Sequence, residues 1–190
     1  MGKFSNLFDS PFLRLENINR FSNRHLTEPD TDSEHSIRMQ LYMLEAYRCT
    51  KAFNIKEACY KALIHDLDEI GCCDIPRPVK YKDSRIEEEI KRVTMELLTE
   101  MNLDQSLLLD MQVAKDDSIE GSLVRIFDVI DAFRTLNLEA WKQHSASLAN
   151  DAENSLQIIR DLGNQLNWNP PIIKEYINQI IQECENIKIS

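Results

Sequence analysis

The chain has 190 residues, which is enough for one well-filled core but short for two, so we expect a single domain over 1–190. Its formal net charge is −10, which argues against nucleic acid or an anionic membrane as a partner, because phosphate contacts need a basic surface. Only four glycines and six prolines are present, so tight turns are few and the composition favours helices.

The cysteines and the N-terminal segment carry little functional signal. Five cysteines at uneven spacing fit neither a disulfide framework nor a CxxC zinc site. The first residues, MGKFSNLFDSPFL, lack the long apolar run of a signal peptide, and no long apolar stretch follows. We therefore expect a soluble cytoplasmic protein.

Two helices are expected early in the chain. Ser33 is a suitable N-cap for a helix over about 33–53. A second helix is predicted over 55–70, with Gly71 as its stop. The residues that define one face of each helix are Ile37, Leu41, Leu44 and Arg48 in the first, and Ala58, Ala62 and Leu63, which we expect to pack inward, in the second.

An ordered loop and two helices are predicted next. The two prolines in residues 74–81 disfavour helix in the residues before them. Residues 85–101 are charged on most faces, which predicts a solvated surface helix, and a short helix is expected over 105–113. The apolar stripe of the surface helix consists of Ile86, Ile90, Val93, Leu97 and Leu98.

Three further helices complete an all-α fold. A central helix is predicted over 122–144, and two more over 150–166 and 171–187, the last beginning after a proline pair. The apolar face of the central helix consists of Leu123, Ile126, Phe127, Ile130 and Phe133.

A candidate metal site is indicated by two histidines and nearby carboxylates. His35 and the dipeptide His65-Asp66 supply nitrogen and oxygen ligands that suit a borderline divalent ion. Asp128 lies on the apolar face of the central helix, where an unpaired carboxylate would be costly to bury. Asp131, one turn further along, competes with Asp128 for this role, and spacing alone does not choose between them.

Glu69 is a candidate for proton transfer. It follows His65 by four residues and Asp66 by three, so a helix would place its carboxyl group beside theirs. A carboxyl group there could exchange a proton with the reacting groups.

These residues together resemble the HD-domain phosphohydrolases, and within them the bacterial 5′-deoxynucleotidases of the YfbR type. The resemblance covers roughly residues 18–140 and implies one compact HD-domain helical bundle, with the helices over 150–187 packed on its catalytic core. The segment from Asp74 to Tyr81 is the narrowest part of the match. The matching residues are Arg20-Phe21, Ser33-Glu34-His35-Ser36, His65-Asp66, Glu69, Gly71, Asp74-Ile-Pro-Arg-Pro-Val-Lys-Tyr81, Asp128 and Ala132.

The resemblance implies a metal site and the residues that serve it. One divalent ion (Co, Mn, Zn, Fe, Ni or Mg) would be held by the four residues His35, His65, Asp66 and Asp128, which favours Asp128 over Asp131. Asp66 and Glu69 would be the catalytic residues, with Glu69 managing the proton.

The resemblance also implies a substrate site. Arg20 would bind the phosphate, and Asp74 with its loop would hold the sugar. Phe21 stands where the family has a tryptophan that screens the 2′-hydroxyl, and Arg77 is a cation where a relative has an uncharged residue. The expected substrate-binding residues are Arg20, Phe21, Asp74, Ile75, Pro76, Arg77 and Lys80.

The activity implied is metal-dependent hydrolysis of the 5′-phosphoester of deoxyribonucleoside monophosphates to deoxynucleoside and phosphate. The alternative is a dNTP triphosphohydrolase, dATP-type, that releases tripolyphosphate, because related phage enzymes share the HD core. A non-catalytic nucleotide-binding module ranks below both. The partner would be a small nucleotide substrate, and relatives of this type suggest a homodimer or a higher homo-oligomer.

Overall fold

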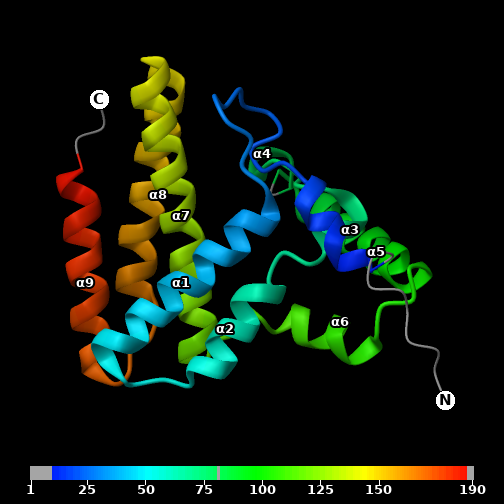
Figure 1. The fold of residues 1–190 in the computed structure, drawn as a ribbon, viewed down its shortest axis with the longest axis horizontal. Coiled ribbons are helices and arrows are strands. Elements are labelled where there is room, and N and C mark those ends of the chain that lie inside the picture. The colour runs from blue at the N-terminus through cyan, green and yellow to red at the C-terminus, as the bar shows by residue number, and fades with distance from the viewer. Residues whose placement is uncertain (1–9, 81, 188–190) are drawn as a thin grey trace. The chain divides into compact units, whose positions relative to one another are not determined.

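The computed structural model describes residues 10–80 and 82–187, apart from the side chains of residues 11, 77 and 78. Within those ranges the regular secondary structure is helical, and extended pairing is limited to one isolated bridge between Asn19 and Thr31. The predicted all-α fold class is therefore confirmed. Figure 1 shows the helices in chain order.

Backbone contacts divide the chain into two compact units, each built from two separate stretches of sequence. The first unit contains residues 1–36 and 64–112, and the second contains residues 37–63 and 113–190. Each unit has its own packing and is described by itself.

The first unit has an apolar core around α3 (Glu69–Cys72). This short helix packs against the 3-10 helix η2 (Pro11–Asn17) and against α5 (Ser84–Glu100), which also contacts α4 (Arg77–Lys80). α6 (Gln105–Gln112) contributes two further buried side chains. The buried residues of this core are Leu15, Ile18, Leu67, Ile70, Leu98, Leu108 and Met111.

α5 is a surface helix, as its charge pattern predicts. The Asp83 side chain caps it by accepting a hydrogen bond from the backbone N–H of Arg85. Of the predicted apolar stripe, Leu98 is fully buried, whereas Ile86 and Val93 stay more than one third exposed. The helix therefore contacts the core along a narrow line.

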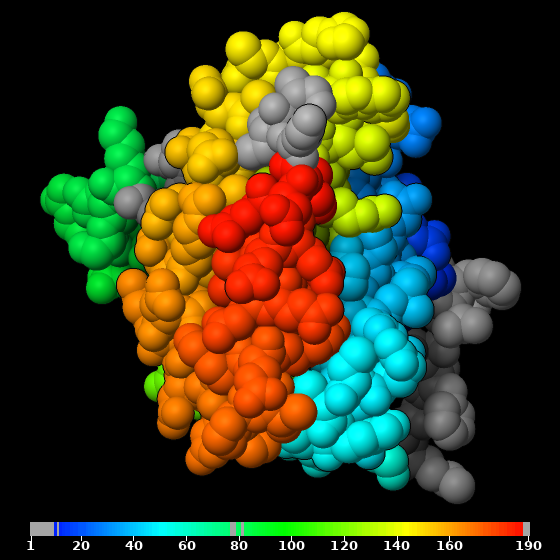
Figure 2. Space-filling model, turned by 90° about the vertical axis from the view of Figure 1, so that its left-hand side faces the viewer, coloured from blue at the N-terminus to red at the C-terminus, as the bar shows by residue number. Residues whose placement is uncertain are grey.

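The second unit is built on three long helices that follow one another in the chain. α7 (Ile119–Gln143) packs against α8 (Ala146–Gln165), and α8 packs against α9 (Pro171–Asn186). Figure 2 shows α9, in red, lying along α8. α9 begins at the second proline of the predicted pair, where a missing N–H costs nothing.

α7 is the most buried helix of this unit and begins slightly earlier than predicted. Ser118 caps it by accepting a hydrogen bond from the Gly121 N–H. A Cβ atom at Gly121 would lie only 2.5 Å from the Asp116 carbonyl oxygen, so the chain can fold back this closely only with glycine there. The predicted apolar face is buried as a whole: Leu123, Ile126, Phe127, Ile130 and Phe133.

α1 (Asp32–Thr50) carries an apolar stripe on its exposed side. Ile37 and Leu41 are each 57% exposed, and Leu44 is 51% exposed. The buried side of the same helix in the second unit is formed by Met39, Met43 and Ala46. Since both faces of this helix are apolar, periodicity locates the faces without telling which one packs inward.

The second predicted helix, 55–70, is divided in the structure. α2 (Ile55–Ile64) ends earlier, and turns carry residues 65–68 before α3 begins. Gly71 is not the stop, because it lies inside α3 and the chain leaves that helix at Cys73, which has a φ of 62°. Two short elements thus replace one long helix.

Side chains of α2 pack as predicted, with one exception. Ala58 and Ala62 are fully buried, but Leu63 is 46% exposed. The buried Lys61 instead anchors this face, because its Nζ donates to both carboxylate oxygens of Asp116 at 2.8 Å. A charged residue therefore occupies a position that an apolar pattern would not assign to the interior.

The two-proline segment is partly helical rather than a loop throughout. Residues 74–76 form a loop, and α4 follows as a single helical turn. Pro78 falls at the second position of this turn, where its missing N–H has no helical acceptor. Tyr81 lies outside the described residues.

Membrane-spanning segments are lacking among the helices that the structure describes, since none of them is both long and apolar enough to cross a bilayer.

Candidate metal centre

A capping box fixes the first turn of α1. The Thr31 hydroxyl accepts a hydrogen bond from the Glu34 N–H, and the Glu34 carboxylate accepts from the Thr31 N–H. The prediction of Ser33 as the N-cap is therefore wrong, because the cap is Thr31, two residues earlier. This box holds His35 one turn into the helix.

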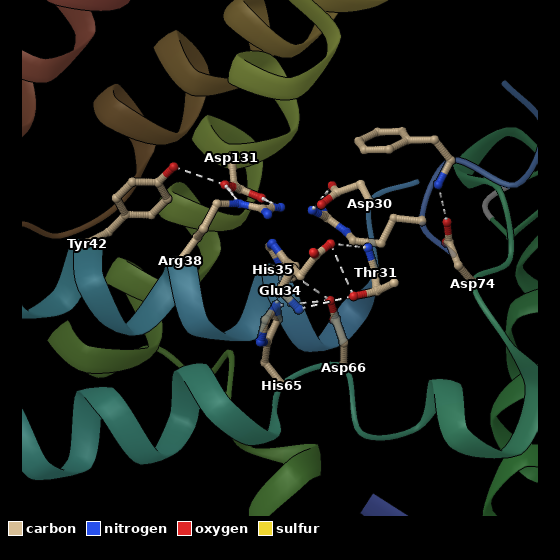
Figure 3. Close-up of polar contacts among 12 residues, drawn as sticks. Asp30, Thr31, Glu34, His35, Arg38, Tyr42, His65, Asp66, Asp74 and Asp131 are labelled. Carbon is tan, nitrogen blue, oxygen red and sulfur yellow. Dashed lines mark hydrogen bonds and ion pairs between the residues drawn. The ribbon is translucent and has the colours of Figure 1, made fainter. Parts of the chain in front are cut away.

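His35, His65 and Asp66 come together in the first unit. His35 projects from α1, and the other two residues stand in the turn that follows α2 (Figure 3). The Nε2 atoms of the two histidines are 3.1 Å apart. The Asp66 Oδ2 atom lies 3.0 Å from Nε2 of His65 and 3.6 Å from Nε2 of His35.

The donor set of this cluster fits a cation. Both imidazole side chains are fully buried, and the Asp66 carboxylate is 16% exposed. Lone pairs of two nitrogens and an oxygen that face one another repel unless a proton or a cation lies among them. Two nitrogens and one oxygen suit a borderline divalent ion such as Zn, Mn, Co, Fe or Ni.

Asp128 belongs to the second unit, on α7. Its side chain is 11% exposed and forms an ion pair with Lys115, whose Nζ atom lies 2.9 Å from Oδ2. This carboxylate is thus nearly buried, with a cation beside it that belongs to the loop before α7.

Asp131 is held by other partners. It is fully buried, and its two carboxylate oxygens accept hydrogen bonds from Arg38 at 2.8 and 2.9 Å. The Tyr42 hydroxyl donates to the same carboxylate at 2.9 Å (Figure 3). These bonds give Asp131 a structural role and explain how a second inward carboxylate is tolerated on α7.

Replacing Asp131 by alanine is expected to destabilise the fold without affecting metal binding. The change removes the carboxylate to which Arg38 and Tyr42 donate. Because Arg38 is only partly buried, we expect a loss of roughly 2–3 kcal/mol in the free energy of unfolding. Urea denaturation of the metal-free protein measures it, with Asp128→Ala as the control that removes the neighbouring carboxylate. Loss of metal binding with unchanged stability would instead make Asp131 a ligand.

Glu69 stands at the start of α3 in the first unit, close to Asp32. Burial raises the pKa of Glu69 to about 12, and the charges of Asp66 and Asp32 add to the shift. Burial also raises the pKa of Asp32 to about 7, opposed by its interaction with Glu69. The pair therefore retains a proton at neutral pH, and Glu69 is the group that holds it.

The Asp32 shift predicts how stability depends on pH. Because the native pKa of Asp32 is about 7 and the unfolded value is 3.8, the native state keeps a proton between these pH values that the unfolded state has lost. The free energy of unfolding of the metal-free protein should therefore fall as pH rises from 4 to 7. Glu69, whose pKa is also raised, contributes to the same fall. Asp32→Asn should therefore make the slope shallower without abolishing it, and add about 1–3 kcal/mol at pH 7; parallel urea midpoints for both proteins would contradict this.

Arg20 and Phe21 lie at the start of the loop 19–30, which precedes α1. The Arg20 guanidinium pairs with Asp30 at 3.4 Å, and both side chains are about nine-tenths buried. It also lies 5.2 Å from the ring centroid of Phe21. The loop from 19 to 30 lines an open hollow of about 590 Å³, with Arg24 and His25 among the lining residues.

The predicted sugar contact is joined to this loop. The Asp74 carboxylate accepts a hydrogen bond from the Phe21 N–H at 2.8 Å (Figure 3). Burial raises the pKa of Asp74, and the Arg20 charge opposes the rise. Phe21 itself has a φ of 56°, a left-handed conformation that this bond helps to hold.

The remaining predicted substrate residues follow Asp74. Ile75 and Pro76 are half-buried in the loop, and Lys80 at the end of α4 lies 4.0 Å from the Asp68 carboxylate. The side chain of Arg77 lies outside the described residues. The structure thus brings Phe21 into contact with both Arg20 and Asp74, where the loop 19–30 meets the loop 74–76.

Sequence reasoning missed three acidic or basic neighbours of these residues. Asp30 pairs with Arg20, Asp32 faces Glu69, and Lys115 pairs with Asp128. Asp32 could have been found, since a helix places it on the same face as His35, three residues later. The other two contacts depend on loop conformations that no periodicity reveals.

Comparison with known proteins places the chain in a family. The family described as 5′-deoxynucleotidase YfbR-like matches residues 8–183. The 5′-deoxynucleotidases YfbR of Escherichia coli strains O1:K1 and K12 are 29% identical over 133 residues, 63% of this chain. The chain spans 66% of the length of these curated relatives.

Solved structures with low sequence identity share the fold. An HD-domain phosphohydrolase from Listeria innocua is 19% identical with a TM-score of 0.69, over 94% of this chain and 88% of that one. The cyanophage S-2L HD phosphohydrolase, bound to dA and one catalytic Zn²⁺ ion, is 16% identical with a TM-score of 0.66, over 96% and 99%. The family match extends over most of the chain, so the protein belongs to the YfbR-like 5′-deoxynucleotidase family.

Proposed function

We propose that the protein is a metal-dependent phosphohydrolase that cleaves the 5′-phosphoester of deoxyribonucleoside monophosphates, yielding a deoxynucleoside and phosphate. The observation that carries the proposal is the buried cluster of His35, His65 and Asp66, with the buried Glu69 interacting with Asp66. Membership of the YfbR-like family supports the same chemistry.

The proposed ligands are His35, His65, Asp66 and Asp128, with Asp128 completing a two-nitrogen, two-oxygen set. Two features support Asp128 over Asp131. Asp131 is already bonded on both oxygens to Arg38, whereas Asp128 is nearly buried beside the Lys115 ammonium. Four protein ligands leave positions open for substrate and water on an ion that accepts five or six.

Held by these residues, a divalent ion would supply Lewis-acid chemistry, lowering the pKa of water and neutralising charge on the phosphoryl oxygens. Asp66 serves as a ligand and orients the cluster. Glu69 holds a proton that the leaving 5′-oxygen of the deoxynucleoside needs when the phosphoester bond breaks, so we assign it as the general acid.

The chain's other residues bind and orient the substrate. Arg20 offers a guanidinium for two parallel hydrogen bonds to the phosphate, and Asp30 holds it in place. Asp74 binds the sugar hydroxyl, with Ile75 and Pro76 as the adjoining wall. Lys80 adds positive charge near Asp74.

The direct test is a substrate panel. Purified protein is incubated with dNMPs, dNTPs and ribonucleotides in the presence of Co²⁺, Mn²⁺, Zn²⁺ or Mg²⁺, and the products are separated by chromatography. We expect orthophosphate and deoxynucleoside from dNMPs, and none after EDTA treatment. Nucleotide binding without any release would favour the non-catalytic binding module.

Phe21 is proposed to disfavour ribonucleotides by occupying the space beside the 2′-carbon. Phe21→Ala should therefore raise kcat/KM for AMP relative to dAMP, by roughly 10-fold, since a lost steric clash of this size is worth about 1–3 kcal/mol. The ratio of the two rates measures it, with Phe12→Ala, an exposed phenylalanine, as the control. A parent enzyme that cleaves AMP and dAMP equally would contradict this role.

A second candidate, dNTP triphosphohydrolase activity, is favoured by one feature. Arg24 and His25 line the same hollow as Arg20 and could bind further phosphates. Release of tripolyphosphate from dATP in the substrate panel would identify this reaction.

We also propose a homodimer. The exposed stripe of Ile37, Leu41 and Leu44 on α1 supports it, since contiguous apolar surface of this kind often marks an interface. Light scattering of the purified protein tests it. A cytoplasmic location and a single domain over residues 1–190 stay predictions.

A further inference from the structure

A cavity of about 360 Å³ lies in the first unit between α5 and α6. Its volume is within the range of small-molecule sites, which is about 300–1,000 Å³. No substrate residue predicted from the sequence accounts for it, except Lys80 at its edge.

Three of the residues that line the cavity are apolar. Ile90 and Met95 come from α5, and Met111 comes from α6. Methionine side chains adapt to flat rings, and their sulfur atoms make favourable contacts with aromatic systems. The walls therefore suit a planar heteroaromatic ring.

Two polar groups stand among these walls. The Thr94 side chain is buried, and its hydroxyl makes no hydrogen bond of good geometry within the described residues, although the Cys72 thiol is near. The exposed Gln112 donates at 3.7 Å to the sulfur of Met95, a weak acceptor. A ligand with ring nitrogens would satisfy both groups better than the protein does.

The cavity adjoins the proposed chemistry on two sides. His65, one of the three clustered ligands, forms part of its wall. Lys80 lines it as well. The charge of Lys80 also acts on Asp74, because it opposes the rise that burial causes in the Asp74 pKa. A nucleotide with its phosphate at the metal centre and its sugar at Asp74 would therefore have its base near this cavity.

The charges of the cavity do not favour a second phosphate. Lys80 lies 4.0 Å from Asp68, and Lys91 pairs with Glu87 at 2.8 Å. Each lysine is thus matched by an acid, and the remaining walls are largely apolar. An uncharged ring fits this surface better than an anion.

We propose that this cavity binds the nucleobase of the substrate, and that Gln112 and Thr94 make the site prefer adenine. A glutamine amide presents a donor and an acceptor side by side, which matches the N6 and N7 edge of adenine. The Thr94 hydroxyl can donate to or accept from a further ring nitrogen. This inference rests on the proposed function, because it assumes that the substrate is a nucleotide.

The test compares Gln112→Leu with Gln105→Leu, an exposed glutamine on the same helix that does not line the cavity. kcat/KM is measured for dAMP and dTMP with the metal-loaded enzyme. We expect Gln112→Leu to lower the value for dAMP by about 10- to 100-fold and to leave dTMP within about twofold, since a bidentate contact discriminates by that much. Thr94→Val should lower the dAMP value in the same direction, and Gln105→Leu should change neither.

Calorimetric titration with deoxyadenosine, which carries no phosphate, examines the cavity independently of catalysis. Parent protein should bind it more tightly than Gln112→Leu does. Equal binding by both proteins, or equal losses on dAMP and dTMP, would overturn the inference. Absence of phosphate release from every dNMP would contradict the proposed function instead, and the titration would still decide whether the cavity binds the base.

Discussion

Asp66→Ala should lose bound metal and catalytic activity together. The carboxylate lies 3.0 Å from Nε2 of His65 and 3.6 Å from Nε2 of His35, so its removal deprives the cluster of the oxygen beside the two imidazoles. The rate should fall on the order of 10³-fold or more, because a bound ion contributes several kcal/mol of charge stabilisation. Bound metal is measured by atomic emission after gel filtration, and activity by phosphate release.

Asp68→Ala is the matched control for this change. Asp68 stands in the same turn, is 30% exposed and lies 4.0 Å from the Lys80 ammonium. It should retain its bound metal, so metal content is the readout that separates the two changes. An Asp66→Ala protein with full metal content and an unchanged rate would remove Asp66 from the site.

Glu69→Gln should retain metal and hydrolyse substrate slowly. Burial, together with the charges of Asp66 and Asp32, raises the pKa of Glu69 and favours its protonated form. Glutamine preserves the shape of the side chain but has no carboxyl proton to transfer, so kcat should fall about 10²- to 10⁴-fold. KM should change little, since the substrate-binding residues are untouched.

The control for Glu69→Gln is Glu87→Gln, an equal change on the surface of α5 that should leave kcat unchanged. A second readout is substrate with a good leaving group, such as a nitrophenyl phosphate ester, which needs no proton. Glu69→Gln should be less impaired on that ester than on dNMP. Equal impairment on both would argue against a general acid.

The clustering of the proposed metal ligands can be predicted from the sequence better than the surroundings of the cluster. His35, His65 and Asp66 lie near turns or ends of helices, and their residue types restrict what they can do. Asp131 is different, because its partners Arg38 and Tyr42 come from a distant helix. Only the folded structure shows that both oxygens of this carboxylate already accept hydrogen bonds.

Helix faces and helix ends were harder to predict. α1 is apolar on both faces, so the exposed stripe at Leu41 could not be distinguished from the buried residues at Met39 and Met43. The end of α2 at Ile64 has no glycine or proline to mark it, whereas the Gly71 that was expected to stop the helix lies inside α3. Tertiary packing overrides local signals at these positions.

Anomalous diffraction from crystals grown with Mn²⁺ or Zn²⁺ tests the metal centre most directly. We expect one peak within about 2.0–2.3 Å of ligand atoms from all four of His35, His65, Asp66 and Asp128. A peak that lacks the two histidines, or one coordinated by Asp131 in place of Asp128, would contradict the proposed site.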